Sequence, residues 1–383
     1  MTAKAHTSAR PSTAPRGGRL RFAWLMLAPA AVALLIHAAI SAPDDMGTDA
    51  ARLRRAYSGP PSGWPAAQID ADAVFAELAP LTLPPRPAPG SVEAARAALG
   101  ESLFNDPALS ASGQIACQSC HNRALGWGDG LPRSIGHDRT EGRRNAPALF
   151  SAGFRETLFW DGRAATLEDQ ARGPLTDPAE MANHDLAAVA ARLATAGRHA
   201  EGFRAAFGSP RATPEAIAAA LAAFQRGLEV PTRLDRFLSG DADALNDAEI
   251  RGLHLFRTKA RCANCHNGPL LTDEQFHNLG LAWYGRSYED LGRYAVTGVI
   301  GDVGRFRTPS LRHVARTAPY MHNGLFPNLR GVAAIYNGGG GQSTAAEAVG
   351  PLADAARQSS TLIRPLTLGP DELADLVAFL SAL

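Results

Sequence analysis

Two short stretches, Cys117-Gln-Ser-Cys120-His121 and Cys262-Ala-Asn-Cys265-His266, decide how this sequence is interpreted. Together they hold all four cysteines of the 383-residue chain. Two thiols three positions apart can each add to one vinyl group of the same porphyrin, and the adjacent histidine can then bind its iron. The pattern therefore predicts a c-type cytochrome with two covalently attached haems, each with the histidine of its motif as an iron ligand.

Two other interpretations of these stretches are a zinc site and a redox-active dithiol. Structural zinc usually takes four protein ligands, whereas each motif offers three. A thioredoxin-like dithiol does not require the histidine that follows. No cysteine remains for a disulfide or a catalytic thiol.

The length and composition are those of an ordinary folded protein. A chain of 383 residues is long enough for about two or three domains. The formal net charge of +1 gives no reason to expect a nucleic-acid partner. Hydrophobic residues make up 45% of the chain, which is enough for normal cores.

The N-terminus has the pattern of a targeting segment. An apolar run from Phe22 to Ala42 follows four arginines, Arg10, Arg16, Arg19 and Arg21. The run ends in small residues that suit a cleavage site, and it is also long enough to span a bilayer. Residues 1–42 are therefore predicted to be a signal peptide or an inner-membrane anchor. Both predict export, and since c-type haem attachment occurs outside the cytoplasm, the rest of the chain is expected in the periplasm.

The remaining chain is expected to be mainly α. Residues 43–90 are rich in proline and predict an extended linker with little core of its own. Helical signals follow: Ser91 before Val92–Phe104, Pro214 before a 4-3-4 apolar spacing, Asn246 with Glu249 as a cap, and Pro370 before the C-terminus. No sustained alternating strand pattern occurs.

A weak internal repeat predicts two related domains. Leu99-Gly-Glu-Ser-Leu-Phe104 precedes the first motif, and Gly252-Leu-His-Leu-Phe256 precedes the second. We expect two cytochrome c-like haem domains, an N-terminal one over 91–236 and a C-terminal one over 237–383.

Longer motifs resemble those of bacterial di-haem cytochrome c peroxidases and the related MauG enzymes, from about residue 95 to the C-terminus. In the first half they are Ile135-Gly-His137, Arg144-Asn-Ala-Pro147, Phe159-Trp-Asp-Gly-Arg-Ala164, Gln170, Pro174 and Glu180-Met181. In the second half they are Gly292-Arg-Tyr-Ala-Val-Thr297, Thr308-Pro-Ser-Leu-Arg312 and Thr317-Ala-Pro-Tyr-Met-His322.

The resemblance implies that hydrogen peroxide reacts at the N-terminal haem, with Glu180 and Gln170 on its distal face. A carboxylate there can take a proton from one peroxide oxygen and return it to the other. Trp160 would pass electrons between the haems. The alternatives are that Glu180 is a surface residue at a helix start and that Trp160 is a core residue.

The resemblance also implies a calcium ion between the domains, at Asn145, Thr317 and Pro319. Such a site would use an amide side chain, backbone carbonyls and water, which suit a hard cation. The sequence has no acidic cluster there, so this site depends on the resemblance alone.

The other face of the C-terminal haem separates the two branches of the family. Peroxidases have a methionine fourteen residues after the histidine of the Pro-Tyr-x-His motif, and MauG enzymes have a tyrosine. Here the position after His322 is Tyr336. A phenolate is hard and favours high oxidation states of iron, whereas a thioether favours the ferrous state. The alternative for Tyr336 is a loop tyrosine beside a glycine turn; Met321 lies at the wrong spacing.

Two histidines do not fit this assignment simply. His137 aligns with the displaceable iron ligand that blocks the N-terminal haem in resting peroxidases, and it could equally be a solvated loop residue. His313 stands where the family usually has asparagine, and the sequence gives no reason for it.

Three functions follow from these observations. The first is a peroxidase that draws electrons through the C-terminal haem from a small electron-transfer protein, a cytochrome c or a cupredoxin. The second is a MauG-like enzyme that stores high-valent iron and oxidises a side chain of a partner protein. The third is a non-catalytic di-haem electron-transfer cytochrome. The sequence leaves the oligomeric state open.

Overall fold

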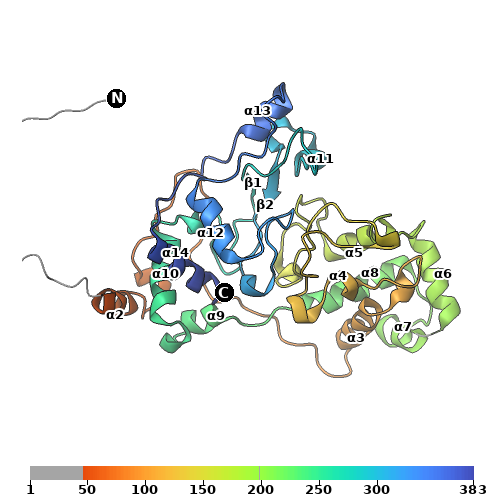
Figure 1. Ribbon diagram of the computed structural model, residues 1–383. Coiled ribbons are helices and arrows are strands. Elements are labelled where there is room, and N and C mark those ends of the chain that lie inside the picture. Colours follow the sequence, from red (N-terminus) through yellow and green to blue (C-terminus); the bar gives the residue numbers. More distant parts are fainter. Residues whose placement is uncertain (1–45, 198) are drawn as a thin grey trace, which may run out of the picture. The chain divides into compact units, whose positions relative to one another are not determined.

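Helices dominate the computed structural model, which describes residues 46–197 and 199–383 (Figure 1). Among these residues the only sheet is a two-stranded antiparallel one, in which Phe276 pairs with Arg307 and Asn278 with Arg305. The prediction of a mainly α protein is therefore confirmed. The predicted signal peptide or anchor, residues 1–42, lies outside the described residues. Thr48–Leu383 forms a unit of its own, which is described below.

The elements have the following bounds. The α-helices of the first half of the chain are α2 (Met46–Ala56), α3 (Val92–Phe104), α4 (Cys117–Cys120), α5 (Leu167–Thr176), α6 (Leu186–Ala196), α7 (Ala200–Phe207) and α8 (Pro214–Arg226). Those of the second half are α9 (Arg233–Leu238), α10 (Asp247–Arg257), α11 (Tyr294–Thr297), α12 (Leu329–Asn337), α13 (Pro351–Arg357) and α14 (Pro370–Leu380). The strands are β1 (Phe276–Asn278) and β2 (Arg305–Arg307). None of the helices in the described part of the chain is both long and apolar enough to cross a bilayer.

A first hydrophobic core joins α3 with α5, α6, α7 and α8, which gather together in Figure 1. Helix α3 begins as predicted, because the Ser91 hydroxyl accepts a hydrogen bond from the Ala94 N–H at 3.1 Å. At Gly100 the helix touches α8 so closely that an added Cβ would lie 1.9 Å from the Ala220 carbonyl oxygen. Glycine at this position therefore sets how closely the two helices approach.

A second core repeats this arrangement with α10 and α14. Helix α10 has the predicted cap, since Asn246 and Glu249 each bond the other's backbone N–H. A Cβ on Gly252 would lie 2.1 Å from the Asp375 carbonyl oxygen of α14. Gly100 and Gly252 each precede a fully buried phenylalanine, Phe104 or Phe256, by four residues. The sequence repeat therefore corresponds to a repeated pair of crossed helices.

The segment before α3 is more strongly packed than predicted. Much of it lacks regular structure, but Tyr57, Trp64 and Leu78 are buried in the second core. The Arg257 side chain of α10 is also fully buried, and it donates to the Pro65 carbonyl oxygen at 2.6 Å and pairs with Glu77. The aromatic side chains of this segment therefore belong to the second core, and the linker predicted over residues 43–90 stays a prediction. The predicted domain boundaries at 90/91 and 236/237 stay predictions.

A buried polar network around Glu229 explains His313. Glu229 accepts hydrogen bonds from Arg312 Nε at 2.8 Å, from His313 Nε2 at 2.9 Å and from the Ser151 hydroxyl at 2.9 Å. The backbone of His313 has φ +59°, a left-handed conformation in which asparagine and histidine are both enriched. Histidine meets that backbone requirement and adds a hydrogen bond to Glu229.

Candidate active site

The first Cys-x-x-Cys-His motif forms a helical turn that orients its histidine. The His121 N–H donates to the Cys117 carbonyl oxygen at 2.9 Å and closes the turn. The His121 Nδ1 donates to the Trp127 carbonyl oxygen at 2.9 Å, which leaves the Nε2 lone pair free for a metal ion. Burial lowers the pKa of His121, so the imidazole is kept in the neutral form that binds metal.

This motif opens onto a space of about 590 Å³ including its solvent-facing mouth, which we call the first cavity. Its walls are mostly apolar. Five residues predicted from the sequence meet there: the two cysteines and His121 of the motif, together with Gln170 and Glu180. The other lining residues are Phe104, Ile115, Ala116, Leu149, Ala171, Pro174, Leu175, Met181, Leu221 and Gln225. Apart from His121, the only ionisable side chains on these walls are the two thiols and the carboxyl of Glu180.

Glu180 lies in the turn that follows α5. Its N–H donates to the Asp177 carbonyl oxygen at 3.1 Å, and the next residue, Met181, bonds back to Pro174 at 3.2 Å. Burial raises the pKa of Glu180 to about 7, and the nearby Asp177 carboxylate adds to the rise, while Arg163 opposes it. A carboxyl group with this pKa can both accept and donate a proton near neutral pH.

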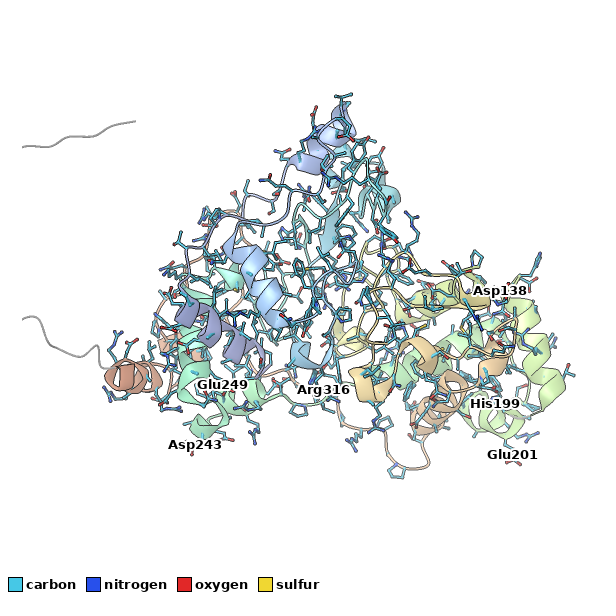
Figure 2. All side chains as sticks on the ribbon, in the orientation of Figure 1. Asp138, His199, Glu201, Asp243, Glu249 and Arg316 are labelled. Carbon is cyan, nitrogen blue, oxygen red and sulfur yellow. The ribbon has the colours of Figure 1, made fainter. Side chains whose placement is uncertain are left out.

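The loop that carries His137 packs against Glu180 through its backbone. The His137 N–H donates to the Glu180 carbonyl oxygen at 3.0 Å, and a Cβ on Gly136 would lie 2.0 Å from the Ala179 carbonyl oxygen. The His137 imidazole lies 3.4 Å from the carboxylate of Asp138, which Figure 2 labels. His137 is not among the residues that line the first cavity. Iron binding by His137 stays a prediction.

The second motif repeats the arrangement of the first. The His266 N–H donates to the Cys262 carbonyl oxygen at 2.8 Å. The His266 Nδ1 donates to the Leu271 carbonyl oxygen at 3.1 Å, which again leaves Nε2 for a metal ion. Burial lowers the pKa of His266 to about 4.

The second motif lines a larger open space, the second cavity, of about 1850 Å³ including its solvent-facing mouth. Tyr336 of α12 and Trp160 both line it together with His266, as do the three residues predicted for calcium, Asn145, Thr317 and Pro319. It is also lined by five arginines, Arg155, Arg261, Arg307, Arg312 and Arg364, whereas no arginine lines the first cavity.

Tyr336 and Trp160 are held by different means. Burial raises the pKa of the Tyr336 phenol. Tyr336 lines the same cavity as both cysteines of the second motif, and its binding to iron stays a prediction. The Trp160 indole N–H donates to the Asn145 carbonyl oxygen at 2.9 Å, and its ring packs edge-on to His322.

Part of the donor set predicted for calcium is already engaged in hydrogen bonds. The Asn145 amide NH2 donates to the Leu131 carbonyl oxygen at 2.9 Å, and the Thr317 hydroxyl donates to Val314 at 3.1 Å. Oxygen atoms remain for a cation, so the calcium site stays a prediction.

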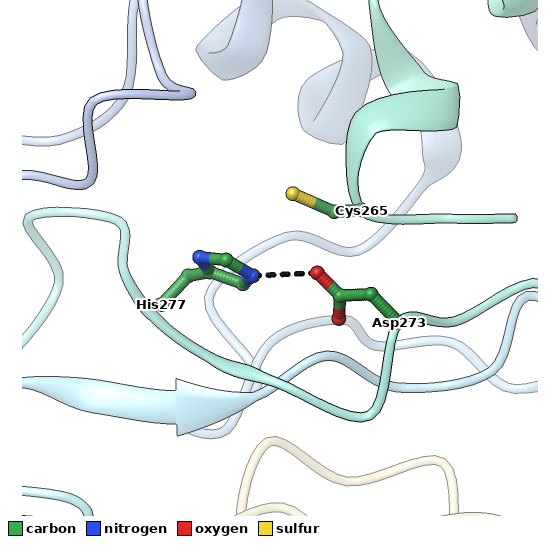
Figure 3. A group of neighbouring side chains, drawn as sticks. All are labelled: Cys265, Asp273 and His277. Atoms are coloured by element: carbon green, nitrogen blue, oxygen red, sulfur yellow. Dashed lines mark hydrogen bonds and ion pairs between the residues drawn. The ribbon is translucent and has the colours of Figure 1, made fainter. Parts of the chain in front are cut away.

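Sequence reasoning missed an acid and an imidazole beside the second motif. Figure 3 shows Asp273 and His277 next to Cys265, with the His277 Nε2 donating to the Asp273 carboxylate at 2.7 Å. One donor atom from each of the three lies within 4.8 Å of the others, and no other such group occurs among the described residues. A thiol joined to a porphyrin is no longer a thiolate ligand, so this group is better described as a hydrogen-bonded pair of Asp273 and His277 beside the second motif. No sequence motif marks it.

Both cavities have what a c-type haem requires. Each offers two thiols on one wall, an imidazole with a free Nε2, and largely apolar walls. The donor set of each is therefore that of a covalently attached haem with a proximal histidine.

The comparisons with known proteins agree with this class of site. A family model described as di-haem cytochrome c peroxidase matches residues 94–243. The cytochrome-c peroxidase IdrP1 of Pseudomonas sp. (strain SCT) is 36% identical over 338 residues, which cover 80% of this chain and 85% of that protein. The methylamine utilization protein MauG of Methylorubrum extorquens is 38% identical over 305 residues, covering 78% and 81%.

A solved structure shares the fold as well. The crystal structure of a MauG-like protein associated with microbial copper homeostasis superposes with a TM-score of 0.66 at 33% identity, over 83% of this chain and 92% of that one. The site and the fold define a c-type cytochrome of the oxidoreductase class. The chain belongs to the family of di-haem cytochrome c peroxidases and MauG proteins.

Proposed function

We propose that this chain reduces hydrogen peroxide in the first cavity and draws the electrons through the second. One observation carries the proposal: Glu180, with a pKa near 7, shares an otherwise mainly apolar cavity with His121. A non-catalytic electron carrier has no use for a proton-transfer group facing its cofactor. The names of the relatives, cytochrome-c peroxidase and MauG, support the same reaction class.

The haem, when attached at His121, supplies the electrons that cleave the O–O bond. The protein then has to move protons. Glu180 accepts a proton from one oxygen of the peroxide that enters the cavity and delivers it to the other oxygen, so that water leaves rather than hydroxide. Overall, one peroxide, two electrons and two protons yield two waters. Gln170, on the same wall, donates a hydrogen bond that holds the peroxide in place.

The second cavity has the opposite role, that of storage and relay. We assign Tyr336 as a residue that would help hold the haem attached at Cys262 and Cys265, because it lines the same cavity as His266. We assign Trp160 as the relay residue, because its side chain lines the second cavity and its backbone carbonyl accepts a hydrogen bond from the Arg307 N–H at 2.8 Å.

Tyr336 also favours a second candidate function, oxidation of a partner protein's side chain as the MauG branch does. A hard anionic ligand stabilises oxidised iron and lowers its potential. The electron source is then either a small electron-transfer protein or that side chain. For both candidates we propose that the chain acts in the periplasm, since its N-terminal sequence and its mode of haem attachment both call for export.

Peroxide turnover by the purified di-haem protein tests the proposal. Glu180→Gln keeps the size of the side chain and removes its proton-transfer capacity, so kcat is expected to fall by about 10²- to 10⁴-fold. The matched control is Glu201→Gln in α7, since Glu201, labelled in Figure 2, is exposed and is not among the residues that line the first cavity. That variant should keep the activity of the parent protein.

Three results separate the alternatives. Loss of turnover in Glu180→Gln alone supports the proposal. Equal turnover in both variants would remove Glu180 from the mechanism. If the haem spectrum of the parent protein does not respond to peroxide at all, the chain is an electron-transfer cytochrome and the proposal is wrong.

A further inference from the structure

The guanidinium group of Arg307 is buried in the wall of the second cavity with one donor unused. Its side chain is 9% exposed, and its Nε donates to the Phe159 carbonyl oxygen at 3.2 Å. Its Nη1 has no hydrogen-bond partner among the described residues, and the nearest carboxylate oxygen, Glu274 Oε2, lies 3.7 Å away. An unsatisfied buried donor on a charged group is costly, by about 1–3 kcal/mol or more.

A second arginine competes for the same carboxylate. Arg155 is 5% exposed, its Nε lies 2.5 Å from Glu274 Oε1, and its Nη2 donates to the Thr308 carbonyl oxygen at 2.9 Å. Burial lowers the pKa of Arg155 in spite of the Glu274 charge. Two buried guanidinium groups therefore share one carboxylate, and both line the second cavity.

The other charged groups nearby do not supply the missing acceptor. The Asp273 carboxylate is engaged by His277 Nε2 at 2.7 Å and by the Gln275 N–H at 2.9 Å. Glu156 acts on Arg155 only through its charge and is exposed. The free Nη1 donor of Arg307 therefore gains a charged acceptor only if an anion occupies the second cavity.

We propose that Arg307, with Arg155 beside it, binds a carboxylate of the cofactor, namely one propionate of the porphyrin attached through Cys262 and Cys265. A porphyrin of this kind carries two propionates, and a guanidinium group binds carboxylates through short, charge-assisted hydrogen bonds. No arginine is among the residues that line the first cavity, so the proposal concerns the second haem. The inference uses one part of the proposed function, the attachment of a haem at His266.

Spectroscopy of the holoprotein tests the anchor without using activity. Arg307→Gln should shift the propionate bending band of one haem in the resonance Raman spectrum. It should also make the midpoint potential of that haem fall as the pH rises from 6 to 8, because a freed propionate gains a proton on reduction. The parent protein should show a flat potential over this range. Arg305→Gln is the matched control, two residues earlier on β2 and exposed.

Two further variants exclude other sources of the effect. Arg307→Gln combined with Glu274→Gln removes the neighbouring carboxylate, and the pH dependence should persist; if it disappears, Glu274 was the titrating group and the proposal is wrong. The parent protein is also measured after removal of small carboxylates and in 200 mM acetate. A potential that depends on acetate would show that the site holds a free anion instead of a propionate.

Failure of this inference differs from failure of the proposed function. A pyridine haemochrome assay that counts one haem per chain would contradict the proposed second haem. Two haems with the same Raman band in Arg307→Gln and Arg305→Gln would overturn the propionate anchor and leave the peroxidase proposal intact.

Discussion

The first and second cavities begin from the same five-residue motif and differ in their walls. In both, the proximal histidine donates its Nδ1 proton to a carbonyl oxygen, of Trp127 at 2.9 Å in one and of Leu271 at 3.1 Å in the other. The first cavity adds one carboxyl group, that of Glu180, to mainly apolar walls. The second adds five arginines, the phenols of Tyr320 and Tyr336, and the indole of Trp160.

The difference teaches that attachment and chemistry are set by separate parts of the sequence. The motifs determine where a haem is bound and which atom of the histidine faces it. Residues far along the chain determine what each haem can do. A carboxyl group with a pKa of about 7 lines the first cavity, whereas guanidinium groups and phenols line the second.

The largest expected effect tests whether the two halves contain the same pair of closely packed helices, α3 with α8 and α10 with α14. Gly100→Ala and Gly252→Ala each place a Cβ about 2 Å from a carbonyl oxygen of the facing helix. Each should lower the free energy of unfolding by about 4 kcal/mol or more, because two backbones must separate. Chemical denaturation measures this.

The control for these variants is Gly301→Ala, where an added Cβ would meet nothing within 4 Å. Its stability should stay within about 0.5 kcal/mol of the parent protein. If only one of the two helix variants is destabilised, the halves are not equivalent and the sequence repeat has no structural meaning.

Local signals predicted the helices well because each has a local cause. Ser91 and Asn246 cap the helices that they precede, and Pro214 and Pro370 occupy first turns. The packing of residues 53–78 was not predictable in this way. Proline content indicates an extended chain, but burial of Tyr57 and Trp64 depends on contacts nearly 200 residues away, such as Tyr57 with His254.

A second prediction concerns the packing of residues 53–78 on the second core, a feature that only the C-terminal half has. Arg257→Met leaves the carboxylate of Glu77 without its partner and removes the bond to Pro65. We expect a loss of about 2 kcal/mol in the free energy of unfolding, because the variant removes the charge-assisted hydrogen bonds of a buried guanidinium group. Limited proteolysis should then cut first between residues 60 and 90.

The combined variant Arg257→Met with Glu77→Gln is the control, and it should recover part of the loss. Cleavage that begins in the N-terminal half instead would contradict the assignment of this segment to the second core.

The candidate site was predictable to the extent that motifs carry it. Cysteine and histidine spacing located both attachment sites, and the family resemblance named Glu180, Gln170 and Tyr336, which the structure places in the expected cavities. Arg155, Arg307 and the pair of Asp273 with His277 could not be found from sequence. Arginines and acids are common surface residues, and only the fold shows that these are buried together.

The smallest expected effect concerns the network between the halves. Burial alone would raise the pKa of Glu229, but the hydrogen bond from His313 and the charge of Arg312 outweigh it and hold the pKa below its ordinary value. For Asp235 too, burial would raise the pKa, yet the Arg312 hydrogen bond keeps it low. Folding therefore favours the ionised carboxylates.

A carboxylate whose pKa is lower in the folded state stabilises the protein fully when the pH is above its unfolded pKa. This stabilisation is lost as the pH falls through the pKa of the folded state. The free energy of unfolding should therefore decrease when the pH is lowered below about 4.5. In Glu229→Gln this decrease should be smaller by about 1 kcal/mol. Thermal unfolding between pH 3 and 7 measures this. A Glu229→Gln curve parallel to that of the parent protein would contradict the role given to this network.

The central claim, that the first haem is open to small molecules and the second is closed by Tyr336, is tested most directly by counting haems that bind cyanide. Absorption and magnetic-resonance titrations of the resting protein give that count. We predict one cyanide-binding haem in the parent protein and two in Tyr336→Ala, since that variant removes the phenol from the second cavity. Two cyanide-binding haems in the parent protein, or one in both proteins, would contradict the account.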